Sequence, residues 1–287
     1  GKLCNLFKDA SFIAGDTRHL SDVDQAFSQK FDALIYLAAF KAVGESMLYP
    51  EKYSINNISA TMNILNSCTK HNCKYVVFSS SAAVYGTPQY LPMDEKHPTN
   101  PDSYYGFTKL KIEEFLSWYD SLKGIKAASL RYFNAAGYAV DGSILGLETN
   151  PQNLLPVIME VAIGKRSHLN IFGGDWPTKD GTCIRDYVHV SDLAIAHVRA
   201  LEYLEKKNES ITLNLGTEEG HSVLEMLEKA REITGKKILS NIVARREGDP
   251  PSSYASSGLA KATIGWAPQY SSLDTLISST WNVYLKN

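Results

Sequence analysis

Short apolar runs alternate with longer helical patterns through the first half of the chain, and this alternation is the strongest constraint on its fold. Apolar runs without polar alternation predict strands at residues 11–14, 33–39, 75–80 and 127–133. The stretches between them predict helices at residues 21–29, 50–70 and 104–123. Continuous apolar strands separated by helices are typical of a parallel sheet covered on both faces. We therefore expect an α/β fold with a doubly wound parallel sheet.

The pattern changes after Gly137, where a Gly/Asp/Asn/Pro-rich stretch over residues 137–152 predicts a connecting loop. The segments beyond it predict helices at residues 153–163, 191–205, 222–234 and 273–285, and strands at 169–172, 211–215 and 238–244. We expect a first domain over residues 1–137, to which residues 184–206 return. A smaller α/β domain is expected over residues 138–287.

The start of the chain lacks a pattern that such sheets normally carry. A dinucleotide-binding sheet begins with a strand, a Gly-rich turn and a helix whose N-terminus holds the pyrophosphate. No G-x-G-x-x-G follows a predicted strand here, and the sequence opens at Gly1-Lys2-Leu3, where the third strand is expected to follow. By this reasoning at least ~30 residues, one βαβ unit, are missing. Either they precede Gly1 in the protein, or this form neither folds nor binds a dinucleotide normally.

Composition excludes several classes of function. The 287 residues are 44% hydrophobic and 21% charged, as in an ordinary soluble globular protein. The net charge is −2 and basic residues form only isolated pairs, which disfavours nucleic acid and membrane surfaces as partners. The longest apolar run, residues 33–40, is too short to span a bilayer, and no signal peptide begins the chain.

The cysteines and histidines predict no metal site. Four cysteines show no C-x-x-C spacing, so reduced thiols and a cytoplasmic location are favoured over disulfides or zinc. The seven histidines are scattered. His189 and His197 are better explained as isolated core or surface residues than as ligands.

Tyr105 and Lys109 form a Tyr-x-x-x-Lys pair at the start of a predicted helix, downstream of a strand that ends in Ser79-Ser80-Ser81. Residues four apart share a helix face, so the phenol and the ammonium are neighbours. A tyrosine titrates near ~10, and roughly 4 kcal/mol from a desolvated cation and a bound cationic cofactor brings it close to neutrality. The pairs at 119/123 and 203/207 have the same spacing but lie in charged stretches, where a solvated helix face is the better interpretation. The sequence thus predicts an enzyme that oxidises, or transiently oxidises, a C–OH group.

Six motifs occur in an order that resembles one known family. They are AAFKAVGES at 38–46, SSSAAVYG at 79–86, YGFTK at 105–109, LRYFN at 130–134, DGTCIRDYVHV at 180–190 and RREGD at 245–249. On these motifs the chain resembles the extended short-chain dehydrogenase/reductases, and within them the UDP-glucose 4-epimerases. The resemblance runs from Gly15-Asp16 to the C-terminus.

The resemblance implies a Rossmann-like fold, tightly bound NAD and inversion of a UDP-hexose at C4 through a 4-keto sugar. Tyr105 is then the base that removes the C4 hydroxyl proton, and Ser81 bridges the hydrogen bond. Lys109 stabilises the phenolate and contacts the nicotinamide ribose. The interconverted sugars are UDP-glucose and UDP-galactose, and the expected partners are a UDP-hexose and a second copy of the chain.

The resemblance also implies residues that bind the two ligands. For NAD they are Asp16, Lys41, Asn57, Lys109 and Tyr132. For the UDP-sugar they are Ser81, Asn134, Asn153, Arg185, Arg246, Asp249 and Ser253. Arg185 and Arg246 suit the diphosphate, because guanidinium binds phosphate oxygens bidentately. The structural alternatives are an ion pair of Arg185 with Asp186 or Asp192, and a plain turn at Asp16.

Two positions narrow the chemistry. Ala82 and Ala83 stand where 4,6-dehydratases need an Asp-Glu acid/base pair, so a dehydratase is disfavoured, as are decarboxylases that use a Glu at that turn. Ser253 matches a position that walls the sugar pocket, and a small residue there predicts that UDP-N-acetylglucosamine and UDP-N-acetylgalactosamine are also accepted. A shift of one residue in register puts Tyr254 there and reverses this expectation.

Other interpretations stay open. The alternatives are a non-catalytic reductase-like binding module, another nucleotide-sugar enzyme of the family, and a net oxidoreductase that releases NADH.

The family pairs the helices predicted at 50–70 and 104–123 between two subunits. These helices carry apolar residues on more than one face, for which packing on the sheet is the alternative explanation: Ile58, Met62, Leu65, Leu110, Phe115 and Trp118.

Overall fold

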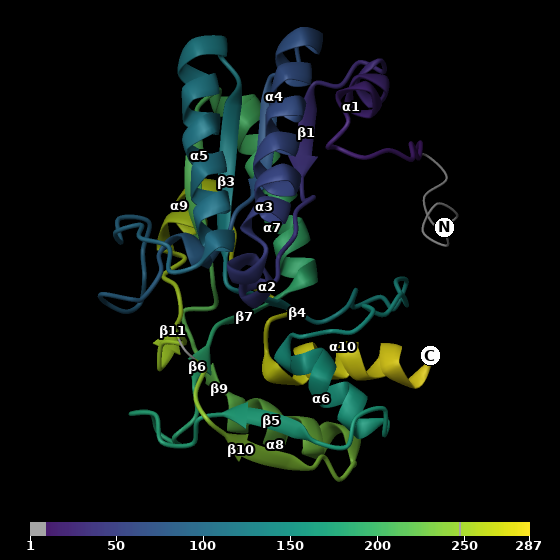
Figure 1. The fold of residues 1–287 in the computed structure, drawn as a ribbon, viewed down its shortest axis with the longest axis vertical. Helices are drawn as coiled ribbons and strands as arrows, with labels where there is room; N and C mark the ends of the chain where they lie inside the picture. The colour runs from purple at the N-terminus through teal and green to yellow at the C-terminus, as the bar shows by residue number, and fades with distance from the viewer. Residues whose placement is uncertain (1–9, 247) are drawn as a thin grey trace.

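A computed structural model describes residues 10–246 and 248–287 (Figure 1). Its helices are α1 Leu20–Phe27, α2 Val43–Leu48, α3 Pro50–Tyr53, α4 Ala60–His71, α5 Tyr104–Lys123, α6 Leu154–Ala162, α7 Val190–Lys207, α8 Val223–Thr234, α9 Gly258–Ile264 and α10 Leu273–Leu285, with a π-helical turn η2 at Ser54–Ser59 and a 3₁₀ turn η3 at Ala82–Val84. Its strands are β1 Ala33–Tyr36, β2 Tyr75–Ser79, β3 Lys126–Tyr132, β4 Asn134–Ala136, β5 Leu169–Phe172, β6 Ile184–Arg185, β7 Tyr187–His189, β8 Ile211–Leu215, β9 His221–Ser222, β10 Ser240–Val243 and β11 Ser252–Ser253.

The largest sheet contains four parallel strands in the order β1-β2-β3-β8. Helices α4 and α5 cover one face and α7 covers the other (Figure 1). Val76 and Val77 follow each other in β2 and join different clusters, Val76 with α4 and α5 and Val77 with α7. Both faces are therefore buried, which explains why the strands read as continuous apolar runs. The doubly wound parallel sheet expected from the sequence is confirmed.

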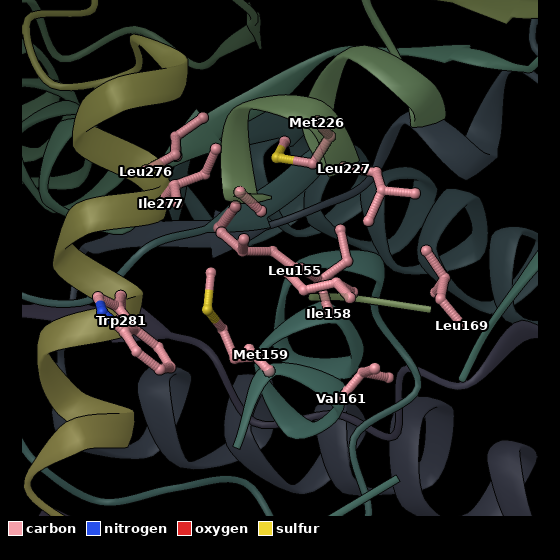
Figure 2. Close-up of a cluster of buried hydrophobic side chains, with 14 of the residues drawn as sticks. Leu155, Ile158, Met159, Val161, Leu169, Met226, Leu227, Leu276, Ile277 and Trp281 are labelled. Carbon is pink, nitrogen blue, oxygen red and sulfur yellow. The ribbon is translucent and has the colours of Figure 1, made fainter. Parts of the chain in front are cut away.

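A second, smaller unit lies at the other end of the molecule (Figure 1). Helices α6, α8 and α10 pack on one another beside the parallel pair β5–β10. Figure 2 shows its core, in which Leu155 and Ile158 of α6 meet Leu227 of α8, and Ile277 and Trp281 of α10. This unit therefore has a hydrophobic core of its own.

The chain passes between the two units more often than a single boundary at residue 137 allows. Of the residues 184–206 expected to return, helix α7 packs on β2 and β3 of the first unit, whereas β6 at 184–185 pairs with β9 and β11. Strand β8 was assigned to the second domain, but it pairs with β3 and completes the first sheet. Helix α9 then packs on α7 and β8. The reason is physical: Leu213 and Leu215 of β8 pack with α7, while the buried Asn214 between them accepts a hydrogen bond from Tyr85 of the first unit at 2.6 Å.

Three local expectations need correction. Residues 11–14 form no strand, and Phe12 is 70% exposed, because an apolar run becomes a strand only where a neighbouring strand accepts its backbone hydrogen bonds. The helix expected at 50–70 consists of α3, η2 and α4, since a π turn has the same apolar pattern as an α-helix. Helices α2 and α9 were not predicted. The loop expected at 137–152 is irregular, as expected.

Within the two described ranges, none of the helices combines the length and the apolar character needed to cross a lipid bilayer.

Candidate active site

Helix α5 brings Tyr105 and Lys109 to the carboxyl end of β2, where the three serines follow. The helix begins at Tyr104 because the Ser103 hydroxyl caps it by accepting the Gly106 N–H at 3.1 Å. A Cβ on Gly106 would lie 2.3 Å from the Ala83 carbonyl oxygen. Only glycine permits this approach, which sets Tyr105 beside the turn that carries Ser81.

The backbone and the side chain of Tyr105 both lie close to a serine. Its N–H donates to the Ser46 hydroxyl at 3.0 Å, and the Ser81 hydroxyl lies near enough to its phenol to lower the pKa of Tyr105. Burial outweighs this effect and raises the pKa of Tyr105 to about 12. The protein alone thus disfavours the phenolate, so a nearby positive charge is needed to make this tyrosine a base.

Lys109 is the cation closest in sequence, and only 4% of it is exposed. Its Nζ donates to the Ser79 carbonyl at 2.8 Å and lies 5.8 Å from the centre of the Tyr105 ring. Burial lowers the pKa of Lys109 to about 7, while the negative charge of Glu113 opposes the fall. The ammonium is therefore poised between its charged and neutral forms near neutral pH.

A buried polar network that the sequence motifs do not reveal lies beneath this group. The Arg131 guanidinium binds the Glu113 carboxylate through Nη2 at 2.5 Å and through Nε at 3.0 Å. The Ser80 hydroxyl donates to the same carboxylate. Arg131 also donates to the Tyr85 hydroxyl at 3.1 Å, which in turn donates to Asn214 of β8 at 2.6 Å. The network thus ties α5, β2, β3 and β8 together below the serine run.

The nicotinamide half of an NAD site fits this geometry. An ammonium carries three donors, and among the described residues the Lys109 Nζ has one hydrogen-bond acceptor, the Ser79 carbonyl. Two donors therefore remain for the hydroxyls of a ribose. Tyr132 ends β3 and so lies at the same edge of the sheet, where the Ser79 hydroxyl opposes the rise that burial causes in the pKa of Tyr132. Dinucleotides bind at this edge of open parallel sheets.

The other three residues expected to bind NAD are already paired within the protein. Asn57 lies in η2 with no exposed surface, accepts from the Phe40 N–H at 2.9 Å and donates to the Phe40 carbonyl at 3.1 Å. It thereby fixes the loop after β1. Lys41 is exposed and pairs with Glu148 at 2.9 Å. Asp16 forms an exposed turn with Arg18, whose hydrogen bonds lower the pKa of the Asp16 carboxyl.

The proposed diphosphate clamp lies on the second unit. Arg185 pairs with Asp249 at 3.4 Å, so its expected alternative partners, Asp186 and Asp192, are not its ion-pair partners. Burial raises the pKa of the Asp186 carboxyl to about 6, and that carboxyl accepts from the backbone of 217 and 255. The Arg246 guanidinium lies 3.7 Å from the centre of the Phe172 ring and is exposed. Both arginines thus keep donors available for a ligand.

The three further residues expected to bind the UDP-sugar lie on three different elements. Ser253 of β11 pairs in register with Arg185 of β6, so the two side chains leave the same face of that small sheet. Asn153 precedes α6, is exposed and makes no capping hydrogen bond with its side chain. Asn134 donates its side-chain amide to the Asp186 carbonyl at 3.0 Å, which fastens β4 to β7.

The remaining candidates of the sequence are structural. Tyr119 donates to Asn66 at 2.9 Å and Tyr203 to Glu209 at 3.4 Å, both at exposed positions. His197 is buried, with Nε2 2.8 Å from the Ser79 hydroxyl and Nδ1 2.7 Å from the Leu193 carbonyl. Since that carbonyl can only accept, Nδ1 carries the proton and Nε2 accepts from Ser79.

The fold and this site define a nucleotide-dependent enzyme of the reductase type, and comparison gives the family. The chain belongs to the NAD dependent epimerase/dehydratase family, whose model matches residues 2–216. It is 44% identical to the UDP-glucose 4-epimerase of Lacticaseibacillus casei over 275 residues, which cover 95% of this chain and 83% of that protein. The UDP-glucose 4-epimerase from Brucella ovis in complex with NAD is 38% identical, with a TM-score of 0.93 over 96% of this chain and 85% of that one. The resemblance predicted from the motifs is confirmed.

A further solved structure is of an epimerase with two sugar substrates. The UDP-Glc/GlcNAc 4-epimerase from Campylobacter jejuni is 36% identical, with a TM-score of 0.86, over 100% of this chain and 87% of that one.

Proposed function

We propose that this protein interconverts UDP-glucose and UDP-galactose by reversible oxidation at C4, using NAD and a 4-keto sugar. One observation carries the proposal: Ser81, Tyr105 and Lys109 come together at the carboxyl edge of the large parallel sheet. The solved structures that share this fold include UDP-glucose 4-epimerases. The family supplies the cofactor class, and the site supplies the proton-handling groups.

In the proposed mechanism Tyr105 removes the proton of the C4 hydroxyl, and Ser81, which lies near the phenol, orients that hydroxyl. Lys109 provides the positive charge that stabilises the phenolate. Lys109 and Tyr132 would hold NAD at this edge of the sheet, and the cofactor would supply the hydride acceptor and donor for C4. Tyr105 then gives back the proton, so no net oxidation results.

Inversion requires that the sugar turns over while the nucleotide stays bound. Arg185 and Arg246 are proposed to hold the diphosphate, with Asn153 as an amide donor and Asp249 as acceptor for the uridine ribose hydroxyls. Asp249 is paired with Arg185 in this structure, so the two residues are already within reach of one ligand. Asn134 is proposed as the weaker contact to the sugar. Strong binding at the diphosphate and weak binding at the hexose allow the keto sugar to rotate.

The test is turnover of UDP-galactose by the NAD-loaded protein, followed by product analysis and by absorbance of the reduced cofactor. We expect UDP-glucose with no steady growth of NADH. Steady NADH growth would identify a net oxidoreductase, and NAD-loaded protein without turnover would identify a binding module. A 4,6-dehydratase is disfavoured because Ala82 and Ala83, in η3 beside Ser81, offer no group that moves a proton.

We further propose that UDP-N-acetylglucosamine and UDP-N-acetylgalactosamine are substrates. Ser253 is half-buried on the face of β11 that it shares with Arg185, whereas Tyr254 lies against Gly220. The structure therefore favours the small residue as the one beside the clamp. Ser253→Tyr should abolish turnover of the N-acetylated sugars and spare UDP-galactose, because overfilling a packed pocket is costly. The proposal would be contradicted if the parent protein turned over UDP-N-acetylglucosamine at less than ~1% of its rate with UDP-galactose. Each tenfold difference corresponds to about 1.4 kcal/mol, so a hundredfold loss would mean that the pocket rejects the larger sugar.

We also propose that two copies of this protein pair through α4 and α5 and that the protein acts in the cytoplasm. Of the apolar residues expected at a dimer contact, Leu65 and Phe115 instead pack on the sheet, whereas Trp118 is 64% exposed. Leu122, one turn further along α5, is 69% exposed, so this face carries two large apolar side chains. Light scattering should give the mass of a dimer, and Trp118→Glu should reduce it to that of a monomer. A monomeric parent protein would contradict the pairing.

A further inference from the structure

Glu113 continues the catalytic face of α5. Tyr105, Lys109 and Glu113 follow one another at intervals of four residues and so lie along one side of the helix. The Glu113 side chain is 9% exposed, and its carboxylate is bound by Arg131 and by the Ser80 hydroxyl. A carboxylate held at this depth beside a buried ammonium acts through a medium that screens charge poorly.

The three serines after β2 connect this carboxylate to the reacting groups. The Ser79 carbonyl accepts from Lys109, the Ser80 hydroxyl donates to Glu113, and the Ser81 hydroxyl meets Tyr105. Each serine thus contacts one of the three α5 residues. A displacement of Glu113 is passed through Ser80 to both neighbouring serines.

We propose that Glu113 is a positioning residue of the reaction: its carboxylate, fixed by Arg131 and Ser80, keeps Lys109 cationic and thereby makes the phenolate of Tyr105 accessible. This inference rests on the proposed function, because it assigns the role of Glu113 within the same site. Glu113 touches neither substrate nor cofactor in this scheme and acts only through Lys109 and the serine run.

The other groups around Lys109 do not supply this charge. Its Nζ lies 4.8 Å from the centre of the Phe78 ring and contacts the Ser79 carbonyl, and both are uncharged. Tyr132 from β3 and His197 from α7 both contact Ser79, the histidine as a neutral ring, and burial lowers its pKa. Glu113 is the acidic group that counteracts the effect of burial on Lys109.

Arg131 offsets part of the carboxylate charge, yet the negative charge of Glu113 still raises the pKa of Lys109 against the effect of burial. Arg131 binds Glu113 with Nε and Nη2, while Nη1 reaches the Tyr85 hydroxyl and the planar group lies 4.9 Å from the centre of that ring. The carboxylate is therefore the member of the pair that acts on Lys109.

The test replaces the charge and keeps the shape, with Glu113→Gln. Carbon-13 NMR of protein labelled at lysine Cε, with the Lys109 signal assigned by Lys109→Arg, measures the Lys109 titration directly. We expect its pKa to fall by about one unit, since an opposite charge at short range shifts a pKa by about 1–3 units. In NAD-loaded protein, the ultraviolet titration of Tyr105, taken as the difference from Tyr105→Phe, should move to higher pH.

The direction of the tyrosine shift separates the explanations. A charge that acts only on Tyr105 itself would make the phenolate easier to form once it is removed, so a shift to lower pH overturns the proposal. An unchanged Lys109 titration overturns it as well, because Glu113 is then only structural. If Glu113→Gln fails to fold, Glu113→Asp is the second variant, because its carboxylate lies one methylene further from Lys109. The pKa of Lys109 should then fall by part of a unit. An unchanged pKa would again overturn the proposal.

Glu160 provides a matched control in the second unit. Its side chain is 4% exposed and its carboxylate binds Arg166 at 2.5 Å, so it is also a buried carboxylate paired with an arginine. Glu160→Gln should lower stability yet leave both titrations unchanged, and a shift like that of Glu113→Gln would overturn the assignment. The NMR titration needs no sugar nucleotide. Loss of the proposed function would appear instead as absent UDP-galactose turnover by the parent protein.

Discussion

The proton-handling group on α5 and the proposed diphosphate clamp on the second unit are built in opposite ways. Lys109 is 4% exposed and Tyr105 is held at its N–H, with its phenol near Ser81, before any ligand arrives. Arg246, by contrast, is exposed on an aromatic ring, and the Asn153 side chain makes no capping bond. Groups that move protons need fixed geometry, whereas groups that grip a ligand need free donors. The predictions below test this difference.

The largest expected effect comes from the buried group. Tyr105→Phe removes the base and leaves the ring, so UDP-galactose turnover should fall by about 10²- to 10⁴-fold. Bound NAD, measured by absorbance after denaturation, should stay at the parent level. Turnover at the parent rate with NAD retained would show that another group moves the proton.

Burial of Lys109 also predicts a pH dependence of stability. The pKa of Lys109 is about 7 in the folded protein, against 10.5 for an ordinary lysine. Between these values the folded state binds fewer protons than the unfolded state, so this residue makes stability rise with pH. Lys109→Met should therefore be more stable than the parent at pH 7, without NAD.

That advantage should shrink as the pH rises towards 10.5, by at most about 1.4 kcal/mol per pH unit. Urea unfolding at pH 7, 8 and 9 measures it. If the difference in free energy of unfolding between the two proteins stays constant across this range, burial does not lower the pKa of Lys109.

The clamp should respond through affinity rather than through stability. Arg185→Ala should weaken UDP binding by about 10- to 100-fold, since a hydrogen bond to a charged group contributes about 1.5–3 kcal/mol. Calorimetric titration with UDP measures it, with Lys206→Ala at the end of α7 as a control. Unchanged UDP affinity in Arg185→Ala would remove this residue from the clamp.

The smallest effect distinguishes a ligand contact from a helix cap. Asn153→Ala should weaken UDP binding by about 3- to 10-fold with little change in stability, because its side chain caps nothing. Ser222→Ala, which breaks the capping box of α8, should cost about 1 kcal/mol of stability and leave UDP affinity unchanged. If the two variants behave alike, the free amide of Asn153 has no role in binding.

The sequence predicted the parts of the site that depend on short spacing. Tyr105, Lys109 and the serine run were accessible because residues four apart share a helix face and strand ends meet at one sheet edge. Arg131 was hidden inside an apolar run at 127–133, and Glu113 inside a charged helical pattern. Their pairing depends on contacts between β3 and α5, which no local pattern contains. The spacing of four residues between Lys109 and Glu113, which places both on one helix face, is a signal that could have pointed to Glu113.

The fold shows the same division. The layers, the order of helices and strands, and the C-terminal helix followed from periodicity, and the structure places α10 at residues 273–285, as expected. The sequence did not predict which sheet β8 joins, because a run of four or five residues contains no information about its neighbouring strand. The π turn η2 did not follow either, although Asn57 within it fixes the loop after β1.

The repeated passage of the chain between its two units has a mechanical consequence. After β3 the polypeptide leaves the large sheet, returns with α7 and β8, leaves again through β9, and returns once more with α9 before ending in α10. Several covalent connections therefore join the two units. One protease cut at residues 137–152 should leave both halves associated, and any opening that admits a sugar nucleotide must bend all of these connections together.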